Sequence, residues 1–294
     1  MNGGQKKLNL NKPRVLQKIK MALEEDIGTG DLTTESLIDN DQISQGVIKV
    51  KEEGVVAGLE VAELVFSILD DEIEFEACVE EGARVKAGSK IAEISGATAS
   101  LLTAERVALN FLQRMSGIAT ATRKFSDLVA DFEVRIVDTR KTTPGLRILE
   151  KAAVHLGGGF NHRQGLYDAV MIKDNHLAAV ESLGAAVDKV RNNVSHTVKI
   201  EVEAETLEQV EEALRAKADI IMLDNMKVNL MKEAVELING RAIVEASGGI
   251  NASTVVEVAK TGVDIISVGA LTHSSNSLDI SFDLVGSDNN GKTA

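Results

Sequence analysis

The second half of the chain alternates short apolar runs with amphipathic segments. The runs are rich in β-branched residues, as expected for buried strands. They are VRIV, AVMIK, VKIEVE, DIIMLD, AIVEAS and DIISVG. The last four begin at residues 198, 219, 242 and 264, so their starts are 21 to 23 residues apart. This spacing is typical of a β/α barrel. Because only six strands are evident, we predict an incomplete or open barrel, or one that recruits a strand this pattern does not reveal.

The first half of the chain has a different pattern. Short alternating strands are predicted between Ile43 and Ser95, with one helix at Leu59–Leu69 among them. Apolar residues at three- and four-residue spacing predict an amphipathic helix over Pro13–Asp26. A second, longer helix is predicted from Thr103, as its N-cap, to about Val129. This half therefore resembles a compact antiparallel platform.

These patterns predict an α/β protein of two domains. An N-terminal α+β, sandwich-like platform covers residues 1–117, and the β/α barrel covers residues 118–274. The C-terminal segment, residues 275–294, is predicted to pack back onto the platform. The polar start MNGGQKKLNLNK lacks the apolar core of a signal peptide, so we predict a flexible tail there and a frayed tail from Ser287.

Composition narrows the class of protein. No apolar run approaches the roughly 18 residues of a membrane-spanning helix, so we expect a soluble protein. The net charge of −13 argues against nucleic acid and anionic membranes as partners. The single cysteine, Cys78, permits no internal disulfide, which fits a reducing cytoplasm. Trp is absent and Tyr occurs once, so an aromatic platform for stacking bases is not expected.

One stretch, Asp138–His176, departs from the acidic background. It carries six Lys and Arg against four Asp and Glu, a balance of 6 − 4 = +2, whereas the rest of the chain has 26 − 41 = −15. The cations come in pairs near the triple glycine 157–159, where backbone can approach a ligand closely. We interpret this stretch as a pocket for a small anion rather than a scatter of surface cations.

The carboxyl ends of the predicted strands carry functional groups. The last residues of five successive runs are Lys173, Glu203, Asp224, Ser247 and Gly269. Active sites of β/α barrels lie at this end of the strands, so we predict that these residues converge on one rim. Ser247–Gly249, which we expect to lead into a helix starting near Asn251, and Gly269–Ala270 offer backbone N–H groups suited to a phosphate.

Several motifs in order resemble one family. They are EDIGTGDLTT, TAERVALNFLQRMSGIAT, TRKTTPGLR, GGGFNHR, IKDNH, LDN, EASGGI and SVGALTHS. Together they resemble the quinolinate phosphoribosyltransferases, the decarboxylating nicotinate-nucleotide pyrophosphorylases of NAD synthesis. Motifs of this length and order are far more specific than a lone glycine fingerprint.

The resemblance implies a role for each matching residue. It assigns the two carboxylates of quinolinate to Arg106, Arg140, His162, Arg163 and Lys173. It assigns the 5-phosphate of phosphoribosyl pyrophosphate to Ser247, Gly248, Gly249, Gly269 and Ala270. Lys141 would lie at the pyrophosphate, and Glu203 and Asp224 would face the ribose hydroxyls and bind Mg²⁺. The catalytic set is then Lys141, Lys173, Glu203 and Asp224, with no organic cofactor.

The resemblance also implies an assembly. One subunit's platform would cover the other's barrel in a homodimer with shared active sites, and the dimers could form hexamers. Arg106 lies on a platform helix, whereas the other cations belong to the barrel, so a shared site would need Arg106 from the partner. Spacing alone leaves Arg106 open as a solvated arginine. His155, His176, His196 and His273 have no close metal-ligand spacing and are interpreted as structural, or as supporting the residues that contact the ligand.

Three alternatives remain open at this point. A related phosphoribosyltransferase paralogue would share the barrel but use a different acceptor. A general phosphosugar barrel enzyme would share only Ser247–Gly249 and Gly269. The rhythm of Gly82, Val85, Gly88 and Ile91 resembles the hairpins of lipoyl and biotinyl carriers, although no Asp-Lys or Met-Lys-Met turn presents Lys86 or Lys90.

Overall fold

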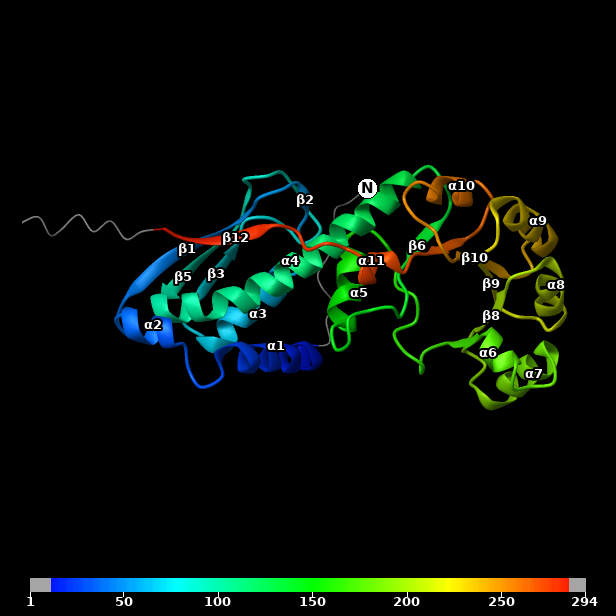
Figure 1. Ribbon diagram of the computed structural model, residues 1–294, viewed down its shortest axis with the longest axis horizontal. Helices are drawn as coiled ribbons and strands as arrows, with labels where there is room; N and C mark the ends of the chain where they lie inside the picture. Colours follow the sequence, from blue (N-terminus) through cyan, green and yellow to red (C-terminus); the bar gives the residue numbers. More distant parts are fainter. Residues whose placement is uncertain (1–11, 286–294) are drawn as a thin grey trace, which may run out of the picture. The chain divides into compact units, whose positions relative to one another are not determined.

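The computed structural model describes residues 12–285, and the chain divides into two compact units (Figure 1). Of the described residues, the first unit comprises 12–121, 143–158 and 275–285, and the second comprises 122–142 and 159–274. The two predicted tails lie outside the described residues, except for Lys12, which begins α1. No helix among residues 12–285 is long and apolar enough to cross a membrane.

The first unit is built on a four-stranded antiparallel sheet in the order β12-β1-β5-β3. Its strands are β1 (Ile43–Val50), β3 (Glu74–Ala77), β5 (Lys90–Ala97) and β12 (Ile280–Val285). β2 (Gly54–Val55) and β4 (Arg84–Val85) form a separate pair. β12 pairs with β1 from Gln45↔Val285 to Val50↔Ile280, and the Phe282 ring fills the space where a Cβ on Gly46 would lie. The C-terminal strand thus completes the sheet's edge.

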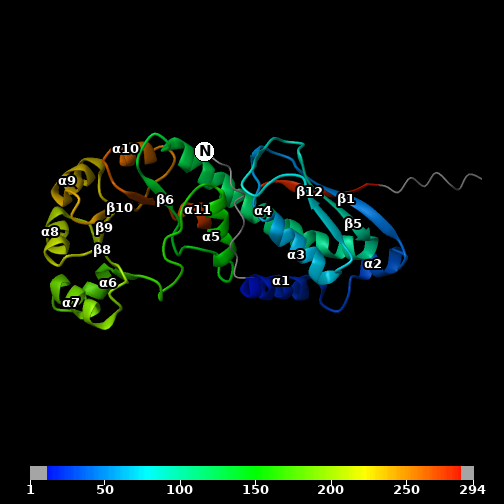
Figure 2. The same cartoon turned by 180° about the vertical axis from the view of Figure 1, so that it is seen from behind.

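Five helices belong wholly or mainly to this unit. They are α1 (Lys12–Ile27), α2 (Leu32–Leu37), α3 (Leu59–Leu69), α4 (Thr98–Leu128) and α5 (Arg147–Leu156). Figures 1 and 2 show α1, α3 and α4 on one side of the sheet. α1 buries Val15, Ile19 and Leu23, which are spaced four residues apart, so a single stripe of this helix faces the core.

The start of α4 corrects one prediction. Thr103 is not an N-cap, because the helix already begins at Thr98, directly after β5. The buried Thr98 hydroxyl lies 2.7 Å from the Ser44 hydroxyl, and its N–H donates to the carbonyl of Gln42. Thr103 instead donates its hydroxyl to Asp31, the N-cap of α2. Tertiary contacts therefore move the helix start by more than a turn.

Helix α5 also differs from expectation. We expected all of residues 118–274 to form the barrel, whereas residues 143–158 group with the first unit. Glu150 on α5 is buried and accepts hydrogen bonds from Arg114 on α4, at 2.8 Å from Nη2 and 3.1 Å from Nε. A Cβ on Gly82 would lie 3.0 Å from the Leu156 carbonyl oxygen. These contacts fix α5 on the platform.

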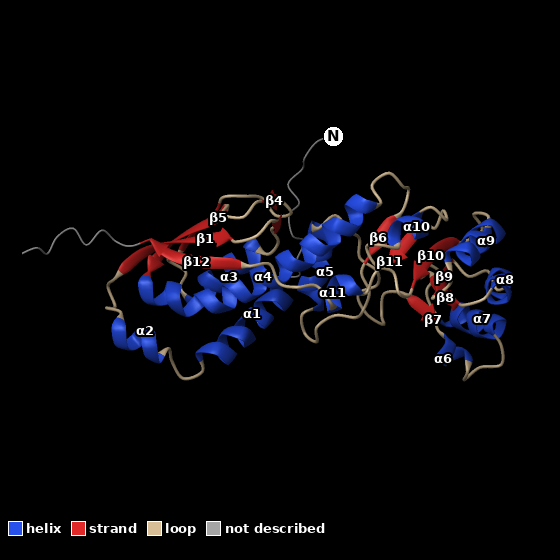
Figure 3. Cartoon of the chain, turned by 45° about the horizontal axis from the view of Figure 1, so that its top comes forward, coloured by secondary structure: helices blue, strands red, loops and turns tan. Residues whose placement is uncertain are grey.

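The second unit contains a single parallel sheet of six strands in the order β6-β11-β10-β9-β8-β7. Its strands are β6 (Arg135–Val137), β7 (Val170–Ile172), β8 (Ile200–Ala204), β9 (Ile220–Asp224), β10 (Ile243–Ser247) and β11 (Ile265–Ser267). Figure 3 shows these strands in red. All six predicted strands are present. Within the described residues β6 and β7 do not pair with each other, so the predicted open barrel is confirmed.

Helices connect and flank these strands. They are α6 (Asp174–Leu177), α7 (Leu183–Asn193), α8 (Leu207–Arg215), α9 (Val228–Ile238), α10 (Val255–Ala259) and α11 (Ala270–His273). Because side chains alternate along a strand, Glu201 and Glu203 share one face of β8, opposite the buried Ile200 and Val202. The same alternation puts Glu245 and Ser247 together on β10.

Candidate active site

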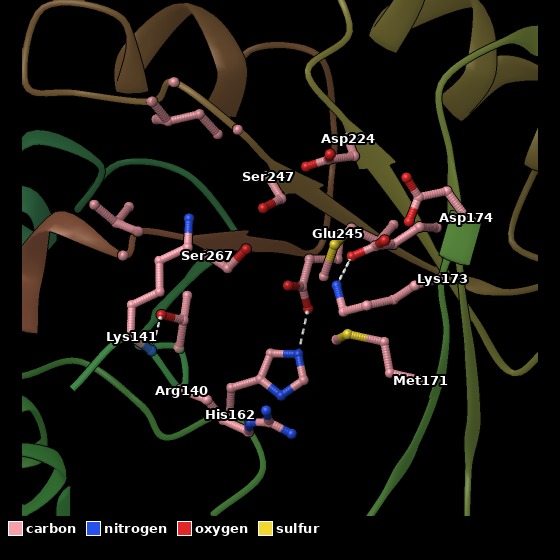
Figure 4. Close-up of a pocket in the computed structure, with 18 of the residues that line it drawn as sticks. Arg140, Lys141, His162, Met171, Lys173, Asp174, Asp224, Glu245, Ser247 and Ser267 are labelled. Atoms are coloured by element: carbon pink, nitrogen blue, oxygen red, sulfur yellow. Dashed lines mark hydrogen bonds and ion pairs between the residues drawn. The ribbon is translucent and has the colours of Figure 1, made fainter. Parts of the chain in front are cut away.

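A cavity of about 780 Å³ opens at the carboxyl ends of β7–β11 and is lined only by residues of the second unit (Figure 4). This volume suits a small molecule. The predicted site residues that line it are Arg140, Lys141, His162, Arg163, Lys173, Glu203, Asp224, Ser247, Gly248, Gly249, Gly269 and Ala270. The predicted rim residues therefore converge in one place.

Arg106 is the exception among the predicted site residues. It lies on α4 in the first unit and does not line the cavity. Its side chain is 57% exposed, and its nearest carboxylate is that of the neighbouring Glu105 at 3.6 Å. Within the first unit, these contacts fit a solvated arginine.

The cations of the cavity come from three segments. Arg140 and Lys141 follow β6, and Arg163 lies in the loop before β7. Burial lowers the pKa of Arg163, and the nearby charge of Arg140 lowers it further. Lys173 directly follows β7, as the N-cap of α6, and pairs with Glu203 of β8. Two guanidinium groups close enough to repel one another create a strong preference for an anionic ligand.

Glycines shape the opposite side of the cavity. Gly248 has φ +88°, and a Cβ there would lie 2.2 Å from Oδ1 of Asn225. Asn225 follows β9 with φ +54° and donates its N–H to the Ser247 carbonyl at 3.0 Å. A Cβ on Gly269 would lie 3.1 Å from Cδ of Lys141, so the glycine gives that side chain its path across the cavity. Gly248 is therefore required sterically, whereas a side chain at Gly269 would displace only the side chains of Lys141 and His273.

The predicted phosphate loop needs a correction. α10 begins at Val255, not near Asn251, because residues 251–254 form a turn. Oδ1 of Asn251 accepts hydrogen bonds from the N–H and hydroxyl of Ser253, which competes with helix formation. A five-residue helix has only a small dipole, so any phosphate affinity here must come mainly from the Gly248–Gly249 backbone and nearby cations.

A buried cluster beneath the cavity was not predicted. Nε2 of His162 lies 3.3 Å from Oε2 of Glu201 and 3.5 Å from Oε2 of Glu245. In Figure 4 the dashed line that starts at the His162 ring marks its contact with Glu245. Asp138, which is fully buried, accepts the His162 backbone N–H at 2.9 Å and the Asn161 side-chain amide at 2.6 Å. Asp138 thus fixes the backbone of the loop that carries His162.

The signal for these glutamates was present in the sequence. Each lies inside an apolar run, two residues before a predicted rim residue, so Glu201 and Glu203 share a face, as do Glu245 and Ser247. An acidic residue within a buried parallel strand is unusual, because such strands are almost wholly apolar. His273, predicted to be structural or to support the residues that contact the ligand, lines the cavity.

Two sets of residues are candidates for a metal. The ligand atoms of His162, Glu201 and Glu245 lie within 4.8 Å of one another. However, Nδ1 of His162 accepts the Arg163 N–H at 2.6 Å, so in the neutral ring Nε2 carries the proton and has no lone pair for a metal. Glu203 and Asp224 end the neighbouring strands β8 and β9 with carboxylates at the cavity, a donor type that suits Mg²⁺.

Comparison with known proteins agrees with this geometry. Residues 31–116 match the family model "Quinolinate phosphoribosyl transferase, N-terminal domain", and residues 118–283 match that of the C-terminal domain. The chain is 48% identical over 260 residues to a probable nicotinate-nucleotide pyrophosphorylase (carboxylating) of Bacillus subtilis, covering 88% of this chain and 90% of that one. It is 44% identical to quinolinate phosphoribosyltransferase (decarboxylating) 2b of Nicotiana tabacum, covering 90% and 80%.

Solved structures give the same result. The crystal structure of NadC from Streptococcus pyogenes superposes with a TM-score of 0.91 at 42% identity, covering 95% of this chain and 99% of that one. Nicotinate-nucleotide pyrophosphorylase from Francisella tularensis has a TM-score of 0.91 at 38% identity, covering 97% and 100%. The two matching domains, the open six-stranded sheet and the similarity to these relatives show that this protein belongs to the quinolinate phosphoribosyltransferase family.

Proposed function

We propose that this protein transfers the phosphoribosyl group of phosphoribosyl pyrophosphate to quinolinate. The products are nicotinate mononucleotide, pyrophosphate and carbon dioxide, and the reaction belongs to de novo NAD biosynthesis. The observation that carries the proposal is the convergence of Arg140, Lys141, Arg163 and Lys173 with two glycine turns in one cavity. Such a cavity fits two anionic substrates, a pyridine dicarboxylate and a sugar with two phosphorylated positions.

The chemistry follows from this arrangement. The ring nitrogen of quinolinate attacks the anomeric carbon as its bond to pyrophosphate breaks, and the leaving oxygen takes that bond's electrons. The transition state resembles a cationic sugar, so positioning and electrostatics supply most of the catalysis. Arg140 and Arg163 orient the acceptor, and Lys141 faces the departing pyrophosphate. Lys173 lies between the acceptor and Glu203, with which it already pairs.

Decarboxylation needs no further cofactor in this scheme. Once the ring nitrogen is quaternary, the carbon–carbon bond to the 2-carboxylate breaks, its electrons stay on the ring carbon, and a proton replaces the carbon dioxide. Mg²⁺, when bound, neutralises charge on the pyrophosphate group. Glu203 and Asp224 would hold it and face the ribose hydroxyls. The cytoplasmic location expected from the single cysteine stays a prediction.

The function has a direct test. With phosphoribosyl pyrophosphate and Mg²⁺, the purified protein should consume quinolinate and release carbon dioxide. Lys173→Ala protein, prepared in the same way, is the control for contaminating activity and should be nearly inactive. Nucleotide formation from nicotinate but not from quinolinate would show instead that the protein is a paralogue with a different acceptor.

We also propose a homodimer with shared sites, in which Arg106 of one subunit serves the cavity of the other. Arg106→Ala and Lys173→Ala should each be nearly inactive alone. After random reassociation about half the dimers are heterodimers, each with one intact site, so roughly a quarter of wild-type activity should return. If Arg106 acts within its own chain, every site keeps one lesion and mixing restores nothing. Native mass spectrometry confirms heterodimer formation and shows whether dimers form hexamers.

A further inference from the structure

Lys141 lies in a segment without regular secondary structure. β6 ends at Val137 and α5 begins at Arg147, so Lys141 takes no part in a helix or a strand. Its side chain nevertheless lines the cavity and extends into it (Figure 4). A cation stabilises a leaving group only if it is held close to its productive position. The contacts that hold the backbone of Lys141 therefore bear directly on the site.

Two threonine hydroxyls contact the backbone of Lys141. The hydroxyl oxygen of Thr139 accepts the Lys141 N–H at 3.0 Å. The hydroxyl of Thr272 donates to the Lys141 carbonyl at 2.7 Å, and its oxygen lies 3.2 Å from the carbonyl oxygen of Gly269. A hydroxyl has one hydrogen, so the shorter contact identifies the Lys141 carbonyl as the main acceptor. Both backbone polar groups of Lys141 thus have a threonine partner.

The contact from Thr272 joins segments that are 131 residues apart in sequence. Thr272 lies in α11, which follows β11, and β11 pairs with β6 through Ser267↔Val137. The chain therefore reaches α11 and the Lys141 segment from adjacent strands. Gly269 precedes Thr272 by three residues, and a Cβ there would lie 3.1 Å from Cδ of Lys141. Residues 269–272 thus contact both the backbone of Lys141 and the stem of its side chain.

We propose that Thr272 is a positioning residue for phosphoribosyl transfer, which holds Lys141 in place against the pyrophosphate group through the hydrogen bond to its backbone carbonyl. The inference rests on the proposed function, in which Lys141 faces the leaving group. Thr272 is fully buried and does not line the cavity, so it acts on the substrate through other residues. Its hydroxyl sets the position of the lysine, and the lysine contacts the substrate.

The consequence is a selective loss for one of the two substrates. Valine fills nearly the same space as threonine but donates no hydrogen bond, so Thr272→Val leaves the Lys141 carbonyl without this donor. A displacement of about 1 Å near the reacting atoms can cost on the order of a hundredfold in rate. We therefore expect Thr272→Val to lower kcat/KM for phosphoribosyl pyrophosphate by roughly tenfold to a hundredfold.

The acceptor should be affected much less. The Arg140 carbonyl accepts the Thr142 N–H at 2.9 Å within the same turn, so Arg140 has a local contact that does not involve Thr272. Arg163, which also orients the acceptor, comes from a different segment. The KM for quinolinate should therefore change little in Thr272→Val.

The test compares steady-state kinetics of the wild-type enzyme with Thr272→Val, Thr272→Ser and Thr261→Val. Serine keeps the hydroxyl, so Thr272→Ser should retain most of the wild-type kcat/KM. Thr261 is the matched control, because it is a buried threonine of the same unit whose hydroxyl donates to the Val258 carbonyl at 2.6 Å, and it does not line the cavity. Thr261→Val should therefore reproduce the wild-type kinetics. Urea unfolding shows whether the two valine variants keep comparable stability.

A double-mutant cycle tests whether Thr272 acts through the lysine. Calorimetry measures the affinity for phosphoribosyl pyrophosphate in Thr272→Val, in Lys141→Ala and in the double variant. Thr272→Val should weaken binding in the presence of Lys141, but should add little once the lysine side chain is removed, because nothing is left to position. A purely structural role would weaken binding equally in both backgrounds.

Several outcomes would overturn the inference. They are a wild-type kcat/KM in Thr272→Val, an equal loss in Thr272→Ser, and additive losses in the double-mutant cycle. If Thr272→Val fails to fold while Thr261→Val folds, Thr272 is a structural residue and the inference is also rejected. Absence of quinolinate turnover by the wild-type protein would reject the proposed function, whereas turnover that Thr272→Val leaves unchanged rejects this inference alone.

Discussion

Both units of the molecule bury glutamates, but they use them differently. In the first unit Oε1 of Glu150 accepts two hydrogen bonds from Arg114, and Oε2 accepts the Thr143 N–H at 3.0 Å. In the second unit Glu201 and Glu245 share one His162 nitrogen, and each keeps a buried oxygen without a partner among the described residues. Satisfied buried polar groups stabilise a fold, whereas under-satisfied ones mark places where function overrides stability.

The two units also differ in where they place residues with a left-handed backbone conformation. In the first unit Gly82 and Gly88 have φ of +80° and +84° in the turns around β4. They account for the glycine rhythm that resembled a carrier hairpin, and Lys90 is paired with Glu93 rather than presented at a turn. In the second unit the left-handed residues Asn225 and Gly248 lie against each other, and Gly248 lines the cavity. Turn glycines thus serve the fold in one unit and the site in the other.

The largest expected effect comes from breaking the ion pair between Glu150 and Arg114. Glu150→Ala leaves the Arg114 guanidinium partly buried without its carboxylate, so the free energy of unfolding should fall by about 3 to 5 kcal/mol. Urea unfolding followed by circular dichroism measures this. The control is Glu257→Ala, which removes an exposed pair with Lys260 and should cost less than about 0.5 kcal/mol. Equal losses in the two variants would mean that burial of Glu150 does not decide its contribution.

The next effect concerns the rim carboxylates. Glu203→Ala and Asp224→Ala should each weaken phosphoribosyl pyrophosphate by about 1.5 to 3 kcal/mol, or roughly tenfold to a hundredfold. Quinolinate should be affected much less, because these residues are expected to face the sugar and its metal. Calorimetry with each substrate separates the two affinities. A similar loss for both substrates would refute the assignment, and unchanged unfolding curves would show that the fold is intact.

Much of this arrangement is predictable from local sequence. The apolar runs themselves predicted all six strands of the second unit, because fully buried parallel strands are largely apolar along their length. The strand-end rule then brought Lys173, Glu203 and Asp224 to one rim before any geometry was known. Both predictions rest on interactions within a few residues or on a general property of the fold.

The failures share a physical cause, which is contact between segments far apart in sequence. α5 lies in the connection from β6 to β7, yet it belongs to the first unit because Glu150 pairs with Arg114, 36 residues earlier. α4 starts at Thr98 because Ser44 and Gln42 fix it there. The Glu201 and Glu245 pair was missed for the same reason, since only the folded sheet brings β8 and β10 to one histidine.

A smaller effect tests the strained turn at the cavity. Gly248→Ala requires a left-handed φ of +88° and displaces the Asn225 side chain, whose Oδ1 would lie 2.2 Å from the new Cβ. We expect a loss of about 1 to 2 kcal/mol in stability and weaker binding of phosphoribosyl pyrophosphate. Thermal unfolding and calorimetry measure the two effects. Gly184→Ala, where a Cβ meets nothing within 4 Å, is the control and should change neither.

The smallest effect concerns Glu81 of the first unit, whose two carboxylate oxygens both accept backbone hydrogen bonds. Its carboxylate accepts the Gly58 N–H at 2.8 Å and the Glu60 N–H at 3.2 Å, at the start of α3. Burial nevertheless dominates and raises its pKa from 4.5 to about 7. Between these values the folded protein holds a proton that the unfolded chain has lost, so stability from this group is full below pH 4.5, falls as pH rises, and levels off above about 7.

After allowance for partial solvent exposure, Glu81→Gln should remove a decline of about 1 kcal/mol from the wild-type profile. Urea unfolding from about pH 5 to 8 measures the decline. If Glu81→Gln and wild type decline equally, a different buried acid causes the decline. If Glu81→Gln also changes the KM for quinolinate, the separation of structural and functional glutamates between the units is wrong.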